Sequence, residues 1–168
     1  MSDLYKTHLE VIEFVLDNCD IKKVIEFGPG NYSTDLFVKR QMDLVSVEQQ
    51  SFDWYKHIKE TFPKISLFYE PNLDFTFSRF KMSYNQFDLV FIDGHEHSRA
   101  VLTNIATNKT KIIICHDTEP KNSHIYGWGV VDKTIEGWEW IDIKNSEVWT
   151  SVFTSNDELK QKLKLRFE

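Results

Sequence analysis

Residues 23–34 place the strongest constraint on how this chain can fold. An apolar run at residues 24–27 ends at the Gly-Pro-Gly of residues 28–30, and a stretch compatible with a helix begins at Ser33. This order predicts a strand, a tight glycine turn and a helix that is capped by Ser33 or Thr34. Such a turn brings bare backbone close to a ligand, next to the unpaired N–H groups of the helix start.

Glu26 indicates which ligand this turn suits. Its carboxylate stands two residues before the first glycine, where it would repel a pyrophosphate, so a dinucleotide site is disfavoured. The third glycine of the nicotinamide fingerprint is also missing, because Ser33 stands in its place. A ligand that carries an ammonium group fits better, although a strand–turn–helix without any ligand stays open on this motif alone.

The composition restricts the class of protein. A length of 168 residues with 41% hydrophobic residues predicts a single domain, residues 1–168, with a core of its own. The net charge of -6 argues against a nucleic-acid partner, and the apolar runs are too short to span a membrane. The N-terminus lacks a signal peptide, and Cys19 and Cys115 form no disulfide framework, so we expect a cytoplasmic protein.

Hydrophobic periodicity predicts regular alternation of helices and strands up to about residue 118. The expected helices are 3–19, 33–40, 51–62 and 97–107, and the expected strands are 23–27, 43–48, 64–69, 87–93 and 111–115. Residues 72–86 fit a short helix or a loop. A short helix near 130–135, strands 138–143 and 148–154 around a turn at 144–146, and a helix at 156–165 complete the chain.

This order predicts an α/β fold: a doubly wound, mostly parallel, Rossmann-like sheet that ends in a C-terminal antiparallel β-hairpin. In such sheets ligands bind beyond the carboxyl ends of the strands. The polar residues that follow the expected strands all fall at this edge. They are Glu26 with the two glycines, Glu48, Glu70, Asp93 and Asp117.

The Glu-x-Gly-x-Gly pattern at residues 26–30 resembles motif I of the class I S-adenosylmethionine-dependent methyltransferases. The resemblance covers about residues 20–155 and includes the closing hairpin. It implies S-adenosylmethionine as the cofactor, with Glu26 facing its methionine end while Gly28 and Gly30 make room. Glu48 would bind the ribose hydroxyls, as its place at the end of the second strand also indicates.

The same resemblance places Glu70 near the adenine. It also allows Asp93 to accept a hydrogen bond from the amine of the methionine part. The family's usual pattern of a small residue and an Asp is absent after the third strand, where Glu70 stands with Pro71.

Asp93 and Asp117 should converge in one cleft, where two carboxylates repel each other unless a cation or a shared proton relieves them. Oxygen ligands of this kind favour Mg²⁺, Mn²⁺ or Ca²⁺. Residues 91–94 and 114–118 resemble the strand ends of metal-dependent small-molecule O-methyltransferases. That resemblance implies a divalent ion held by Asp93, Asp117 and Thr118, although Thr118 replaces an amide of that family. Asp93 acting without a metal stays an alternative.

The family's lysine base has no match, and we expect a histidine in its role. His95, His97 and His116 should cluster at the cleft edge, where His95 or His116 together with Asp93 could carry the catalytic proton transfer. A second branch of the family, which often acts on sugars, is similar in its Asp-Gly-His and His-Asp regions, but the spacing here departs from it.

The sequence therefore predicts an S-adenosylmethionine-dependent methyltransferase that acts on a small-molecule acceptor, at a hydroxyl group, with assistance from a divalent metal. The acceptor site would come from residues 72–86, a lid at 119–137, the N-terminal helix or a partner subunit, so a homo-oligomer stays open. Two alternatives remain: a non-catalytic S-adenosylmethionine-binding protein or subunit, and a metal-dependent enzyme of other chemistry on the same fold.

Overall fold

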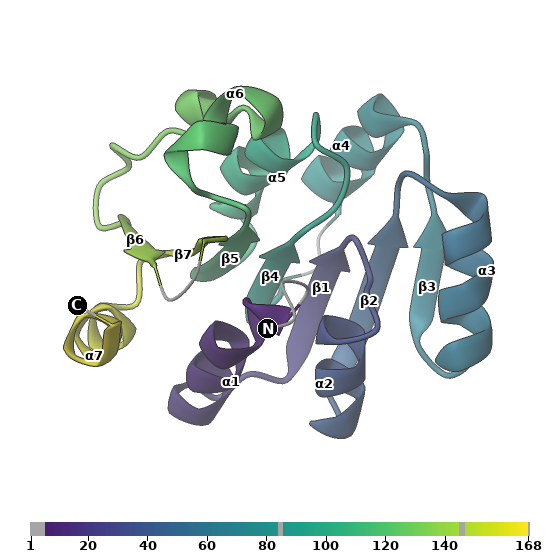
Figure 1. The fold of residues 1–168 in the computed structure, drawn as a ribbon, viewed down its shortest axis with the longest axis horizontal. Helices are drawn as coiled ribbons and strands as arrows, with labels where there is room; N and C mark the ends of the chain where they lie inside the picture. Colours follow the sequence, from purple (N-terminus) through teal and green to yellow (C-terminus); the bar gives the residue numbers. More distant parts are fainter. Residues whose placement is uncertain (1–5, 84–85, 145–146, 168) are drawn as a thin grey trace.

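The structure is a computed structural model that describes residues 6–83, 86–144 and 147–167. These residues form a seven-stranded sheet in the order β3-β2-β1-β4-β5-β7-β6 (Figure 1). β1 to β5 run parallel, and β7 is antiparallel to both of its neighbours. The strands are β1 (Lys23–Phe27), β2 (Asp43–Glu48), β3 (Ser66–Tyr69), β4 (Leu89–Ile92), β5 (Ile112–His116), β6 (Glu139–Ile143) and β7 (Thr150–Thr154).

Helices cover both faces of the sheet (Figure 1). The α-helices are α1 (Leu9–Asn18), α2 (Ser33–Lys39), α3 (Phe52–Thr61), α4 (Leu73–Met82), α5 (Arg99–Ala106), α6 (Ser123–Tyr126) and α7 (Asp157–Phe167), and the 3₁₀ turns are η2 (Pro120–Asn122) and η3 (Trp128–Val130). The predicted doubly wound sheet with an antiparallel ending is confirmed. None of the described helices has the length and apolar composition that a membrane span requires.

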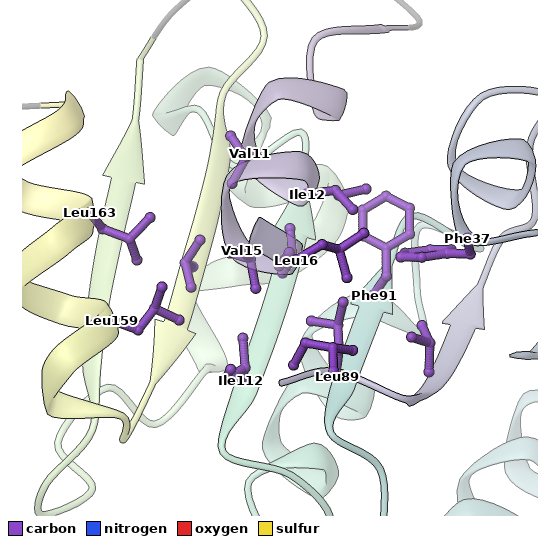
Figure 2. Packing of buried hydrophobic residues seen from close by; sticks show 14 of the residues in the cluster. Val11, Ile12, Val15, Leu16, Phe37, Leu89, Phe91, Ile112, Leu159 and Leu163 are labelled. Atoms are coloured by element: carbon purple, nitrogen blue, oxygen red, sulfur yellow. The ribbon is translucent and has the colours of Figure 1, made fainter. Parts of the chain in front are cut away.

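Two apolar clusters, one on each face, hold these layers together. α1 contributes Val11, Ile12, Val15 and Leu16 to the first cluster, which Phe37 of α2 and Leu159 and Leu163 of α7 complete (Figure 2). The second cluster lies under α4 and α5 and includes Phe80, Leu102 and Trp128. Successive strand residues alternate between the two faces, so Val24 belongs to the first cluster and Ile25 to the second.

Side-chain caps explain some of the helix starts. The predicted cap of α2 by Ser33 or Thr34 is wrong: both hydroxyls donate to Glu26, and α2 begins without a side-chain cap. Ser51 accepts a hydrogen bond from the backbone N–H of Trp54 at the start of α3. Residues 72–86, expected to be either a helix or a loop, contain α4, because Asn72 caps it through the N–H of Phe75. The Asn72 side chain therefore stabilises the start of α4.

Two expectations about local structure are wrong or lie beyond the described residues. The short helix near 130–135 is absent, because the Asp132 carboxylate accepts hydrogen bonds from the backbone N–H and the hydroxyl of Thr134, which favours a turn over a helix. Residues 145–146 of the expected hairpin turn, and residues 3–5 of the expected first helix, lie outside the described chain. Within it, the first helix begins at Leu9.

Candidate functional site

The loops after β1 to β4 leave the sheet at the same edge. The backbone N–H of Gly28 donates to the carbonyl of Val47, and the N–H of Asp93 donates to the carbonyl of Phe27, at 3.0 and 2.8 Å. The N–H of Glu70 donates to the carbonyl of Glu48 at 2.9 Å. This edge therefore collects the polar residues that the sequence placed after each strand.

The two glycines of the turn after β1 differ in what a side chain would meet at their positions. Gly28 has φ +86°, and a Cβ at this position would lie 2.4 Å from the carbonyl oxygen of Asp93, so the contact between the two loops itself requires glycine. A Cβ at Gly30 would meet only the Ser33 hydroxyl, at 3.7 Å. Gly30 therefore leaves open space in front of the turn, as a bound ligand would need.

Glu26 is fully buried and is satisfied by three hydroxyl groups. Oε1 accepts from Ser33 at 2.6 Å, while Oε2 accepts from Thr34 and Ser46 at 2.8 and 2.9 Å. Burial raises the pKa of Glu26 to about 7, against the opposing effect of these hydroxyls. The Thr34 hydroxyl also accepts from the N–H of Gly30 at 3.1 Å. Glu26 thus fixes the shape of the glycine turn through Thr34.

Glu48 ends β2 with one carboxylate oxygen available. Oε1 accepts from the backbone N–H groups of Gln50 and Ser51 at 2.7 and 2.9 Å, which orients the side chain. Oε2 has no hydrogen-bond partner among the residues that the structure describes, although only 4% of Glu48 is exposed. An oriented carboxylate oxygen without a protein partner suits the hydroxyls of a ribose.

Glu70 lies at the edge of an apolar cavity between β1–β3 and α4. The cavity has a volume of roughly 350 Å³, and Phe27, Val47 and Phe80 contribute to its apolar wall. Glu70 accepts from the N–H of Asn72 at 3.3 Å and lies 3.9 Å from the guanidinium of Arg79, which also lines the cavity. Its predicted contact with the adenine stays a prediction.

Arg99 is a residue of this site that the sequence interpretation missed. It lies between the two carboxylates that were expected to share a metal, with Nη2 3.1 Å from Asp93 and Nη1 2.8 Å from Asp117. It also donates to the carbonyls of Gly94 and His116, and its guanidinium lies 4.1 Å from the centre of the Tyr126 ring. The sequence signal for Arg99 was the need for a cation beside the two carboxylates, since Arg99 is the first arginine or lysine after Asp93.

The predicted magnesium-type ligand set does not fit this arrangement. Arg99 already neutralises Asp93 and Asp117, and its side chain is only 8% exposed. The Thr118 hydroxyl accepts a hydrogen bond from Ser151 at 2.6 Å. A divalent ion shared by Asp93, Asp117 and Thr118 would have to displace Arg99 and Ser151, so these three residues do not fit such an ion.

Asp93 and His116, two of the predicted catalytic residues, are brought together. Nδ1 of His116 lies 3.2 Å from Oδ1 of Asp93, and Nε2 lies 2.9 Å from the hydroxyl of Thr7. Burial alone would lower the pKa of His116, but Asp93 and then Asp117 outweigh it, so this pKa lies above its ordinary value. Burial alone would raise the pKa of Asp93, but His116 and Arg99 outweigh it and hold this pKa below its ordinary value.

The predicted cluster of His95, His97 and His116 is divided in the structure: His95 lies beside His97, whereas His116 lies beside His8. His95 contacts His97 at a ring distance of 5.4 Å, and its Nδ1 accepts from the N–H of His97. His116 instead meets His8, which precedes α1, at a ring distance of 4.7 Å. No sequence pattern near His8 predicts its contact with His116, because the two residues are 108 positions apart in the chain (116 − 8).

Comparison with known proteins identifies the fold. No model of a protein family and no curated protein sequence matches the chain. An O-methyltransferase from Bacillus cereus, solved in complex with SAH, is similar in structure at a TM-score of 0.67 and 12% identity, over 92% of this chain and 82% of that one.

Two further solved structures are similar. The O-methyltransferase TomG from Streptomyces achromogenes, in complex with SAM, has a TM-score of 0.62 at 12% identity, over 93% of this chain and 82% of that one. The N-methyltransferase NodS from Bradyrhizobium japonicum WM9 has a TM-score of 0.61 at 10% identity, over 89% and 94%. This chain therefore has the fold of the class I S-adenosylmethionine-dependent methyltransferases.

Proposed function

We propose that this protein is an S-adenosylmethionine-dependent methyltransferase that methylates a hydroxyl group of a small-molecule acceptor. The observation that carries the proposal is the convergence, at one edge of a methyltransferase-like sheet, of an open glycine turn, an oriented carboxylate and an Asp–His pair. The first two suit the cofactor and the third suits the acceptor. The solved neighbours support the cofactor, since two of them hold SAH or SAM.

The cofactor half of the proposal rests on Gly30 and Glu48. Gly30 leaves space where the methionine part would lie, and the unpaired Oε2 of Glu48 would accept from a ribose hydroxyl. Glu26 would act indirectly, through the hydroxyls that hold the turn. The bound cofactor supplies a methyl group on a positively charged sulfur, so the protein has mainly to align the acceptor with it.

The acceptor half rests on Asp93 and His116. A hydroxyl group must lose its proton as it attacks, and an imidazole that is oriented by a carboxylate is suited to take it. In the structure, Nε2 of His116 already holds a hydroxyl, that of Thr7, at 2.9 Å. An acceptor hydroxyl at the same nitrogen would be in position for proton transfer. His95, half-buried and near Asp93 in the chain, is retained as a second candidate base.

The remaining expectations stay predictions. The neighbours include both O- and N-methyltransferases, so a hydroxyl acceptor is inferred from Asp93 and His116 alone. A divalent ion at Asp93, Asp117 and Thr118 is disfavoured by the position of Arg99. A cytoplasmic location, a homo-oligomer and an acceptor other than nucleic acid stay predictions from the sequence.

Calorimetric titration with S-adenosylmethionine and S-adenosylhomocysteine tests the cofactor. We expect micromolar binding, and we expect Glu48→Gln to weaken it by about 1.5–3 kcal/mol, because the variant loses a charged acceptor for the ribose. Glutamine can still accept from Gln50 and Ser51, so the loop should keep its shape. Glu60→Gln, the same change at an exposed position of α3, is the matched control and should bind like the wild type.

Three outcomes would change the proposal in different ways. Absence of binding to either compound would refute the cofactor. Equal affinity in Glu48→Gln and Glu60→Gln would remove Glu48 from the site. Tight binding without methyl transfer to any panel of hydroxylated acceptors would favour a non-catalytic binding protein.

A further inference from the structure

His8 is a buried imidazole for which the proposed methyl transfer gives no role. Only 4% of the residue is exposed, and neither Nδ1 nor Nε2 has a hydrogen-bond partner within the described part of the chain. His8 stands at the N-cap of α1, but its side chain makes no capping hydrogen bond there. Burying a polar group without a partner costs about 1–3 kcal/mol, so the position calls for a ligand.

The ring of His8 points into a group of metal-ligating side chains. It lies edge-on to the His116 ring at 4.7 Å and packs against Phe91 at 5.3 Å. One ligand atom each from His8, Asp93 and His116 can be chosen so that all three lie within 4.8 Å of one another. An ion with ligand distances of about 2.0–2.2 Å holds its ligand atoms roughly 3–4 Å apart, so small side-chain rotations would close the set.

We propose that His8, Asp93 and His116 form a binding site for a first-row transition-metal ion such as Zn²⁺. Two imidazoles and one carboxylate are a ligand set of zinc enzymes and of non-haem iron sites, and they leave at least one position open. The site differs in ligands and in metal class from the magnesium-type site that the sequence predicted at Asp93, Asp117 and Thr118.

The surroundings of the three residues resemble those of a metal site. Ligating histidines commonly direct their second ring nitrogen to an oxygen partner, and Nε2 of His116 meets the Thr7 hydroxyl at 2.9 Å. Ligating carboxylates are held in the same way, and Asp93 is held by Arg99 at 3.1 Å.

Arg99 argues more strongly against the magnesium-type site than against the proposed site. A Mg²⁺ site would need both Asp93 and Asp117, and Arg99 contacts both of them. The proposed site needs Asp93 but not Asp117, and its other two ligands are imidazole rings; Arg99 meets His116 at its backbone carbonyl, at 3.0 Å. Nitrogen ligands also select transition-metal ions over Mg²⁺. A metal ion at this site would stabilise the negative charge on an acceptor oxygen directly. His116 would then serve as a ligand of the ion and not as the base.

Zinc titration of the metal-free full-length protein, prepared without a histidine tag, tests the site. We expect one equivalent of Zn²⁺ to bind, without competition from millimolar Mg²⁺, and we expect a Co²⁺ adduct with visible absorption bands. His8→Phe keeps the ring contacts to Phe91 and His116, and should weaken Zn²⁺ binding more than about a hundredfold. His97→Phe is the matched control, because His97 is exposed and pairs with Glu96; its affinity should equal that of the wild type.

A milder variant covers the case in which His8→Phe fails to fold. Thr7→Val removes the hydroxyl partner of His116 and should weaken Zn²⁺ binding by about 10–100-fold. The proposal is overturned if the wild type binds no Zn²⁺, if folded His8→Phe binds it as tightly as His97→Phe, or if Thr7→Val has no effect. The titration needs neither cofactor nor acceptor, so its result is independent of the test for methyl transfer.

Discussion

At the scale of single residues, Glu26 and Glu48 show how neighbouring carboxylates acquire different roles. Glu26 pairs with Ser46 across β1 and β2, and Glu48 lies two residues further along β2 on the same face. Three hydroxyls satisfy both oxygens of Glu26, whereas two backbone N–H groups occupy only one oxygen of Glu48. The number of local donors therefore separates a carboxylate that supports the turn from one that can bind a ligand.

The raised pKa of Glu26 predicts a specific dependence of stability on pH. Its pKa is about 7 in the folded protein and 4.5 for an unperturbed Glu, so the folded state holds the proton more tightly. This stabilisation is complete below pH 4.5 and is lost as the pH rises through 7. Between pH 5 and 8 the wild type should lose about 2–3 kcal/mol of unfolding free energy relative to Glu26→Gln, which cannot ionise.

Urea unfolding of both proteins at pH 5 and pH 8 measures this difference. Glu60→Gln, an exposed change of the same kind, should follow the wild type at both pH values. A constant gap between the wild type and Glu26→Gln across this range would mean that Glu26 has an ordinary pKa in the folded protein.

At the scale of elements, the segment from β1 to α2 is the best example of structure that could be predicted from sequence. Its signals are local: an apolar run, a glycine turn and hydroxyl residues within twelve positions, from 23 to 34. The alternation of helices and strands up to β5 could be predicted for the same reason. The helix expected near 130–135 failed because a single Asx turn at Asp132 outweighs weak periodicity.

The candidate site could be predicted only where it depends on strand ends. Asp93 and His116 each follow or end an apolar strand, and parallel strands align such positions at one edge. Arg99 reaches that edge from the first turn of α5, and His8 reaches it from the chain before α1. Their positions depend on how helices pack on the sheet, and hydrophobic periodicity does not specify which polar side chain fills a gap between strand ends.

The contact between the β1 and β4 loops gives a prediction about Gly28. Gly28→Ala should reduce the unfolding free energy by more than about 2 kcal/mol, because its Cβ would lie 2.4 Å from the carbonyl oxygen of Asp93 at a φ of +86°. Gly129→Ala is the matched control: a Cβ there meets nothing within 4 Å, and the change should stay within about 1 kcal/mol. Urea unfolding at one pH measures both, and similar effects would refute the close approach of the two loops.

At the scale of the whole molecule, the first and last helices share one apolar cluster. Val15 of α1 and Leu163 of α7, both labelled in Figure 2, are fully buried within it. So is Ile114 of β5. Arg166 of α7 adds an exposed ion pair to Glu10 of α1 at 3.1 Å. Helices near the two ends of the chain thus pack on the same face of the sheet, which is the arrangement expected if residues 1–168 unfold as a single domain.

This arrangement predicts that a cavity under α7 destabilises the whole molecule. Leu163→Ala should lower the unfolding free energy by about 2–5 kcal/mol. Leu165→Ala, in the same helix but at an 89% exposed position, should change it by less than about 0.5 kcal/mol. Far-ultraviolet circular dichroism reports the helices, while fluorescence reports tryptophans such as Trp128 and Trp138 in the cluster on the opposite face.

In Leu163→Ala both signals should move together to a lower urea midpoint, because a single cooperative unit transmits the lost packing across the sheet. If instead the dichroism shifted while the tryptophan transition stayed at the wild-type midpoint, α7 would be unfolding by itself. The single domain would then be wrong, and the boundary would lie between β7 and α7, which follows that strand directly.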